Sequence, residues 1–394
     1  MKISPGHKIP AIVDREPDQH GGADPLLAHA RVPHVVVAEA FLTPMTPDDN
    51  VDSPALWLDG EGRAVLLATA KASGRLMRYD GDTGAAAGVV GEKGSGPGQF
   101  DRPNGIFVAD DLVFVVERDN RRVQVLRLPA MAPVGSFGQE ELQQPYGIWL
   151  RSAGARRYEV LVSDAYMDGE DARGEDILPP LDQLDRRLRR YQVEVRAGAL
   201  HAKPAGNVGD IGQAGAIRIP ESVWGDPTHD RLLVAEEDTA VGTSVRVYNL
   251  SGRYQGSDIG RGVFKAQAEG IALWQCGEEG YWITTDQFKD RSLFHIWDRT
   301  TLLAHAAPRT RAALLSGRSS SPAARTASGC EAISDTREHT ISACAAENSS
   351  CRASCGSTSS SRRPWASTAC ASTRRSRTRA GCTGVTDWGC WSGK

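Results

Sequence analysis

A short pattern recurs five times along the chain: S-P-A-L-W-L (53–58), R-P-N-G-I-F-V (102–108), Q-P-Y-G-I-W-L (144–150), I-P-E-S-V-W-G (219–225) and Q-A-E-G-I-A-L-W (267–274). Each copy is followed by a second short apolar run, and most of these runs end on a charged or polar residue. The first-strand markers, which stand 49, 42, 75 and 48 residues apart, are Pro54, Pro103, Pro145, Pro220 and Ala268. A period near about 40–50 residues with several short strands per unit is typical of a β-propeller.

A third strand is predicted in every unit. The copies read R-L-M-R-Y-D-G, R-V-Q-V-L-R-L, R-R-Y-Q-V-E-V, V-R-V-Y-N-L-S-G and F-H-I-W-D-R. We therefore predict an all-β, six-bladed-type β-propeller in which about five blades are recognisable. Val32–Thr43 is predicted as the strand that closes the ring, because an unpaired sheet edge favours aggregation. In the long third unit, residues 179–190 (P-P-L-D-Q-L-D-R-R-L-R-R) read as a short amphipathic helix or a solvated charge run.

The chain joins two regions of opposite charge. Residues 301–394 carry 12 Arg, 1 Lys and 5 acidic residues, so their balance is 13 − 5 = +8, whereas residues 1–300 carry 33 − 44 = −11. The last 94 residues also hold seven of the eight cysteines and neither Phe nor Tyr. Neither the strand period nor the helix period persists there. We interpret 301–394 as a low-complexity, disordered tail produced by a frameshift near residues 302–305, with a disulfide module as the rival interpretation.

The remaining segments bound the protein's surroundings. Residues 1–31 are predicted as a disordered leader without a core, and 32–300 as an incomplete propeller. The start M-K-I-S-P-G-H-K-I-P has no continuous apolar run before Pro10, so no signal peptide is predicted in the chain as it stands. No apolar run approaches the roughly 20 residues that span a bilayer. We expect a monomer that binds neither membrane nor nucleic acid.

The ends of the strands carry the residues with chemical potential. In a propeller these ends converge on the central channel, which here would gather two cations, several carboxylates and a few hydrogen-bonding groups. They are Lys71, Arg118, Glu221, Glu237, Glu269, Asn104, Tyr146 and Gln287. Clustered carboxylates raise one another's pKa unless a cation neutralises them, and hard oxygen ligands suit Ca²⁺. Lys and Arg beside such a metal suit a phosphate. The set predicts metal-assisted phosphoester hydrolysis by metal-bound water, with solvated rim residues as the alternative.

Three of these segments resemble the β-propeller phytases, which are six-bladed, calcium-dependent phosphatases of myo-inositol hexakisphosphate. V-D-S-P-A-L-W-L resembles the D-D-P-A-I-W opening of that family. E-S-V-W-G-D-P-T-H-D-R-L-L-V-A-E-E-D resembles its E-G-M-A…L-Y-I-A-E-E-D. A-E-G-I-A-L-W…G-Y-W-I-T-T-D-Q-F resembles its I-E-G-L-T-I-Y-Y…G-Y-L-I-A-S-S-Q-G. The resemblance covers about residues 45–300.

The resemblance implies a role for each site residue. The residues that would bind phosphate oxygens are Lys71, Arg118 and Tyr146. Those that would coordinate calcium are Asp52, Glu221, Glu237, Glu269 and Gln287. Catalysis would rest on Lys71, Arg118, Tyr146, Glu221 and Glu237. The substrate would be phytate, and the protein would be secreted or periplasmic.

The chain departs from the family at four places. Ser53 replaces the second aspartate of D-D-P-A, and Gln267 stands where an aspartate is usual. V-S-D-A at 162–165 offers no lysine where the family has one. The last-blade segment S-D-T-D-G-I-D is absent. The loss of that blade predicts impaired folding and low or no activity for this chain.

One unit resembles a different repeat. G-E-K-G-S-G-P-G-Q-F-D-R-P-N-G-I-F-V…V-V-E-R-D-N-R-R-V-Q-V (91–125) is similar to an NHL-type propeller repeat, in which Gly and Pro serve turns and Asn and Arg stabilise the blade. Such a repeat specifies no reaction. A non-catalytic NHL-like binding propeller is therefore the main alternative. A lactonase-like calcium hydrolase is a second one, and it leaves Lys71 and Arg118 together unexplained.

Overall fold

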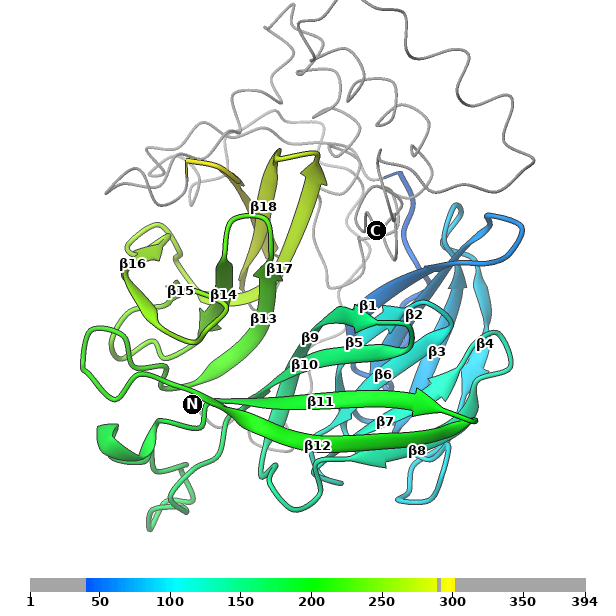
Figure 1. Cartoon of the computed structure of the whole chain (residues 1–394), viewed down its shortest axis with the longest axis horizontal. Helices are drawn as coiled ribbons and strands as arrows, with labels where there is room; N and C mark the ends of the chain where they lie inside the picture. The colour runs from blue at the N-terminus through cyan, green and yellow to red at the C-terminus, as the bar shows by residue number, and fades with distance from the viewer. Residues whose placement is uncertain (1–39, 289–291, 302–394) are drawn as a thin grey trace, which may run out of the picture.

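Five antiparallel sheets follow one another around a common centre in the computed structural model, which describes residues 40–288 and 292–301 (Figure 1). Each sheet is one contiguous stretch of chain with its strands paired in sequence order, and we call these sheets blades 1 to 5. Blade 1 contains β1–β4 (Val51–Leu58, Ala64–Ala70, Arg75–Asp80, Ala86–Val90) and blade 2 contains β5–β8 (Pro103–Ala109, Leu112–Glu117, Arg122–Arg127, Ala132–Phe137). Blade 3 contains β9–β12 (Pro145–Gly154, Arg157–Asp164, Leu188–Arg196, Ala199–Val208) and blade 4 contains β13–β16 (Pro220–Asp226, Arg231–Glu236, Ser244–Tyr248, Tyr254–Ile259). Blade 5 has three described strands, β17–β19 (Gln267–Cys276, Glu279–Gln287, Ser292–Asp298).

The first strand of each blade is the innermost one. Strands β1, β5, β9, β13 and β17 contact one another in this order around the centre (Figure 1). This arrangement is a β-propeller, so the predicted all-β fold is confirmed, and every predicted third strand is present. The only helical turn among the described residues is the 3-10 segment Leu181–Gln183. No helix in that part of the chain is long and apolar enough to cross a membrane.

Residues 179–190 do not form the predicted amphipathic helix. Beyond the single turn at Leu181–Gln183, the segment enters β11, where Leu188 pairs with Ser163 of β10. The preceding Arg187 is fully buried and donates a hydrogen bond to the Tyr166 carbonyl at 2.6 Å. Strand pairing and the buried hydrogen bond of Arg187 therefore outweigh the helical charge pattern of this segment.

The predicted terminal segments lie largely outside the described residues. Of the proposed closing strand, only Ala40–Thr43 is described, and these four residues contain no strand. The leader 1–31, the rest of the closing strand and the tail from residue 302 lie outside the described residues.

A bulge near the start of each innermost strand sets the register of the blade. The pair that precedes the bulge joins the start of that strand to the end of the second strand: Pro103 with Glu117, Pro145 with Asp164, Pro220 with Glu236, and Ala268 with Asp286. In blade 5 one further pair, Gln267 with Gln287, lies before it. In blade 1 the equivalent residue is Val51, which pairs with Ala70, whereas the predicted marker Pro54 lies beyond the bulge. The predicted alignment of the first unit is therefore wrong by 54 − 51 = 3 residues. The corrected register makes Asp52 equivalent to Asn104, Tyr146, Glu221 and Glu269.

Aromatic side chains fill the centre of the ring beside the bulges. The rings of Phe107 (β5) and Trp224 (β13) lie 5.5 Å apart, although β9 separates their strands in the ring order. Trp224 also packs against the apolar cores of blade 1 and of blades 4 and 5. Burying such side chains contributes about 1.5–3 kcal/mol each. The polar residues at the bulges therefore lie next to these apolar aromatic side chains.

Candidate functional site

Two positions in each blade carry the predicted site residues. On the innermost strand, the residue directly after the pair that precedes the bulge is the ring position, occupied by Asp52, Asn104, Tyr146, Glu221 and Glu269. On the second strand, the residue directly after the partner in that pair is the end position, occupied by Lys71, Arg118, Ala165, Glu237 and Gln287. In blades 1 to 4 its backbone N–H donates to the carbonyl just before the innermost strand, at 2.9–3.1 Å. Ring and end positions are therefore held side by side by the backbone.

Lys71 connects blade 1 to blade 3. Its Nζ lies 3.0 Å from Asp52 Oδ1 and donates a hydrogen bond of 2.7 Å to the Tyr146 hydroxyl. Burial lowers the pKa of Lys71, but attraction by Asp52, Tyr146 and Glu221 outweighs it and raises that pKa well above its ordinary value. Burial, followed by the charge of Glu221, raises the pKa of Tyr146 well above its ordinary value. The channel thus holds a charged lysine against a neutral phenol.

Three glutamates gather beside this pair. Glu221 is 4% exposed and shares a hydrogen bond with Glu269, while Glu237 accepts one from Gln267 Nε2 at 2.6 Å. Burial and the neighbouring charges of Glu269 and Glu237 raise the pKa of Glu221 well above its ordinary value. Burial and Glu237 raise the pKa of Glu269 to about 7. Burial also raises the pKa of Glu237, against the opposing effect of Lys71. These carboxyls hold protons more tightly than free glutamates do.

The other predicted residues occupy the same two positions with different contacts. Arg118 Nη2 donates to Gln144 Oε1 at 3.2 Å, and its Nη1 lies 4.0 Å from Asp119. Gln287 pairs through its backbone with Gln267 and Ser292. Asn104 is fully buried, and within the described residues neither its amide nitrogen nor its amide oxygen has a hydrogen-bond partner. A buried amide without partners is costly, so Asn104 points to a ligand.

A second set of carboxylates has a structural role, and the sequence alone does not distinguish this set from the channel glutamates. In blades 2 to 5 the second-strand residue of the pair that precedes the bulge is a buried acid, and each of these acids accepts one or two backbone N–H groups from residues before its own innermost strand. We call these the anchor carboxylates: Glu117, Asp164, Glu236 and Asp286. Each also lies within 3.8 Å of a basic side chain on the third strand: Arg122, Arg189, Arg246 or His295.

The anchors explain two sequence observations. In the NHL-like unit, Asn120 and Arg122 both donate to Glu117, and Arg122 also donates to the carbonyls of Ser95, Gly96 and Gln99. These hydrogen bonds hold the loop before β5 to the end of β6, which is the kind of contact that the NHL-type resemblance implies for Asn and Arg. In V-S-D-A, Asp164 is the anchor and Ala165 takes the end position, so blade 3 places no cation in the channel.

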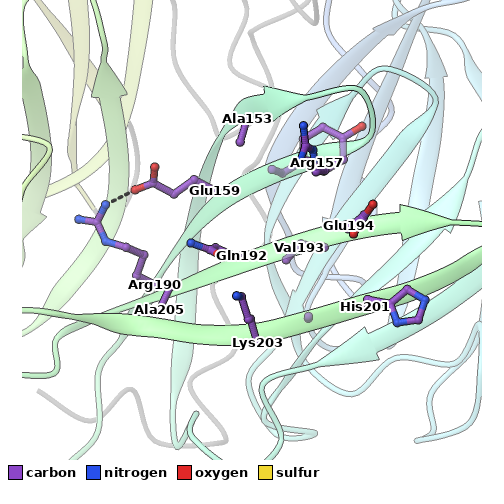
Figure 2. Close-up of a pocket in the computed structure, with 12 residues that line it drawn as sticks. Ala153, Arg157, Glu159, Arg190, Gln192, Val193, Glu194, His201, Lys203 and Ala205 are labelled. Carbon is purple, nitrogen blue, oxygen red and sulfur yellow. Dashed lines mark hydrogen bonds and ion pairs between the residues drawn. The ribbon is translucent and has the colours of Figure 1, made fainter.

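A hollow of about 700 Å³ lies elsewhere, on one face of blade 3 (Figure 2). Its lining includes Glu159, Arg190 and Lys203, and the dashed line in Figure 2 marks the ion pair between Glu159 and Arg190. It contains none of the predicted site residues. Among residues 40–288 and 292–301, no group of three His, Cys, Asp or Glu side chains is already arranged to hold a metal ion.

Comparisons with known proteins do not assign the chain to a family. No protein-family model and no curated protein matches the chain. The crystal structure of a nidogen/laminin complex is similar with a TM-score of 0.41 and 11% identity, over 63% of this chain and 76% of that chain. Kuenenia stuttgartiensis hydrazine synthase is similar with a TM-score of 0.40 and 12% identity, over 67% of this chain and 80% of that chain. Neither likeness carries an argument about this chain.

Proposed function

We propose that this propeller is a calcium-dependent phosphoric monoester hydrolase of the 3-phytase type, acting on myo-inositol hexakisphosphate. The observation that carries the proposal is the crowding of Glu221, Glu237 and Glu269 next to the Lys71–Asp52 pair. Like charges in a buried channel are unfavourable, and strongly shifted pKa values cluster at functional sites. A divalent cation would remove the repulsion.

The donor groups of the channel fit calcium. Carboxylate and amide oxygens are its preferred ligands, and the channel offers Glu221, Glu237, Glu269, Gln287 and the amide of Asn104, which has no partner in the described part of the chain. Asp52 stands beside them, paired with Lys71. Binding would replace the hydrogen bonds that Glu221 makes with Glu269 and Glu237 makes with Gln267. When bound, calcium supplies the positive charge that activates water for attack on phosphorus.

The remaining residues would handle the phosphate. Lys71 offers a point charge, and Arg118 offers a planar fork that matches two phosphate oxygens. Tyr146 stays neutral at physiological pH, so its hydroxyl remains a hydrogen-bond donor. Without a metal, four carboxylates face two cations, and this balance opposes a polyanionic substrate. Calcium is therefore expected to bind before phytate.

The alternative is a non-catalytic NHL-like binding propeller. It is favoured by the fully paired network of Glu117, Asn120 and Arg122 in blade 2 and by Ala165 at the end position of blade 3. A phosphate-binding lysine would be expected at that place from the family resemblance. In this case the channel would bind a cation without turning over a phosphoester.

Phosphate release from phytate separates the two functions. The assay compares the 394-residue chain with a protein whose reading frame is restored after residue 301, each with and without calcium. Calcium-dependent release by the restored protein, lost in Glu237→Gln and kept in Glu194→Gln, supports the hydrolase. Glu194 is a matched glutamate on β11, outside the channel. Calcium binding without release selects the binding propeller, and release equal to that of Glu237→Gln contradicts the hydrolase.

A further inference from the structure

Three hydroxyl side chains occupy one position of the repeat, directly before the second-strand residue of the pair that precedes the bulge. They are Thr69, Ser163 and Thr285. Each accepts a hydrogen bond from a backbone N–H in the bulge of its own blade: from Ser53 at 3.1 Å, from Gly147 at 2.7 Å and from Gly270 at 2.6 Å. In the two remaining blades the position holds Val116 and Ala235, which lack a hydroxyl.

Two of these hydroxyls also reach the next blade. Thr69 donates to the carbonyl of Asn104, and Ser163 donates to the carbonyl of Glu221, both at 2.7 Å. Asn104 and Glu221 are the ring residues of blades 2 and 4, the two blades without a hydroxyl of their own. Each hydroxyl thus joins the bulge of one blade to the ring position of its neighbour.

The bulge makes this contact important for Glu221. In β13 the ladder with β14 pairs Pro220 and then Val223, so Glu221 and Ser222 have no ladder partner in their own sheet. The hydrogen bond from Ser163 holds the Glu221 backbone from outside that sheet. Ser163 is fully buried, and its hydroxyl is engaged with Gly147 and Glu221, so it has no role as a nucleophile.

We propose that Ser163 is a positioning residue that sets the place of the Glu221 carboxylate in the channel. This inference rests on the proposed function in one respect, namely that Glu221 is a ligand of calcium. Partners that orient a ligand are worth about 10–100-fold in metal affinity. Replacing Ser163 by alanine removes the acceptor for Gly147 and the donor to Glu221, so β13 is free to move at its bulge.

Calcium titration calorimetry on the full chain tests the proposal with three variants. S163A is expected to bind calcium about tenfold more weakly. S163T keeps the hydroxyl and is expected to bind like the unsubstituted chain, because threonine is native at the equivalent positions 69 and 285. S244A is the matched control, since Ser244 is fully buried and its hydroxyl has no hydrogen-bond partner among the described residues. Equal affinity in S163A and S244A would overturn the proposal.

A second readout keeps the positioning role separate from the proposed function. If the unsubstituted chain binds no calcium, the proposed function fails, and Ser163 is judged by hydrogen exchange of the peptide that contains Glu221. Faster exchange of this peptide in S163A than in S163T and S244A supports the positioning role. Unchanged exchange overturns it.

Discussion

Glu236 and Glu237 are neighbours in the chain with opposite surroundings. Glu236 is an anchor that accepts hydrogen bonds from the N–H groups of Arg218 and Ile219, at 2.6 and 3.0 Å, and lies 3.8 Å from Arg246. Glu237 faces the channel, where its hydrogen-bond partner is Gln267 and its charge adds to those of Glu221 and Glu269. Anchor carboxylates are satisfied by the fold, whereas channel carboxylates are not. Anchor carboxylates therefore stabilise the propeller, whereas channel carboxylates are available to bind a ligand.

Removal of an anchor should produce the largest effect. Asp164→Ala leaves Arg189 and the N–H groups of Gln143 and Gln144 without their carboxylate. Breaking a buried charge pair in this way costs about 3–5 kcal/mol. Urea unfolding of the full chain measures the loss, with Glu221→Gln as the channel counterpart. If Asp164→Ala lowers the free energy of unfolding no more than Glu221→Gln does, the distinction between anchor and channel carboxylates is wrong.

Replacement of a channel glutamate should instead stabilise the calcium-free protein. The pKa of Glu269 is raised from 4.5 to about 7, so the folded protein binds this proton more tightly than the unfolded chain. Its contribution to stability is complete below pH 4.5 and is lost as the pH rises through about 7. Glu269→Gln is expected to stabilise the calcium-free protein at pH 8 by up to about 3 kcal/mol. Between about pH 5 and about pH 8, the unfolding temperature of Glu269→Gln should therefore depend less on pH than that of the unsubstituted chain. An identical pH dependence in the two proteins would refute the crowding of the glutamates.

Replacement of Lys71 should shift the same pH dependence of stability to higher pH. Lys71 lowers the pKa of Glu221, Glu237 and Glu269. In Lys71→Met the fall in stability should therefore extend to higher pH. Lys93→Met is the control, because Lys93 is exposed and pairs with Asp101 outside the channel. An unshifted profile in Lys71→Met would show that Lys71 does not neutralise the glutamates.

Asn104→Ala should have the smallest effect on stability. The buried amide has no hydrogen-bond partner among the described residues, so its removal breaks no bond and is expected to change the free energy of unfolding by less than about 1 kcal/mol. Calcium affinity should fall all the same if the amide belongs to the ligand set. A large loss of stability with unchanged affinity would assign Asn104 to the anchors.

Much of the fold was predictable because a repeat imposes its own geometry. The apolar runs and their turns predicted the strands, and the period predicted the propeller. The first unit was misaligned because Pro54 imitates the other prolines, while hydrogen bonding places Val51 at that position. The predicted helix at 179–190 was wrong because pairing of Leu188 with Ser163 outweighs a helical charge pattern.

The sequence predicts which residues meet in the channel, but not their contacts. Strand ends converge in any propeller, so Lys71, Tyr146 and Glu221 were expected together. The second strands end in adjacent acidic or polar residues, and their spacing does not distinguish an anchor such as Glu236 from a channel residue such as Glu237. The hydrogen bond from Ser163 to the next blade has no signal in the sequence, although the hydroxyls of L-L-A-T-A-K, V-L-V-S-D-A and W-I-T-T-D-Q stand at one place in the repeat. Contacts between blades have no signature within a single unit.

Direct titration of calcium into the full chain at neutral pH tests most directly whether the channel carboxylates form a cation site. The unsubstituted protein and Glu194→Gln are predicted to bind calcium and to release protons, since the pKa of Glu269 lies at about 7. Glu237→Gln is predicted to lose this binding. No binding in the unsubstituted protein, or equal binding in all three, would contradict the account.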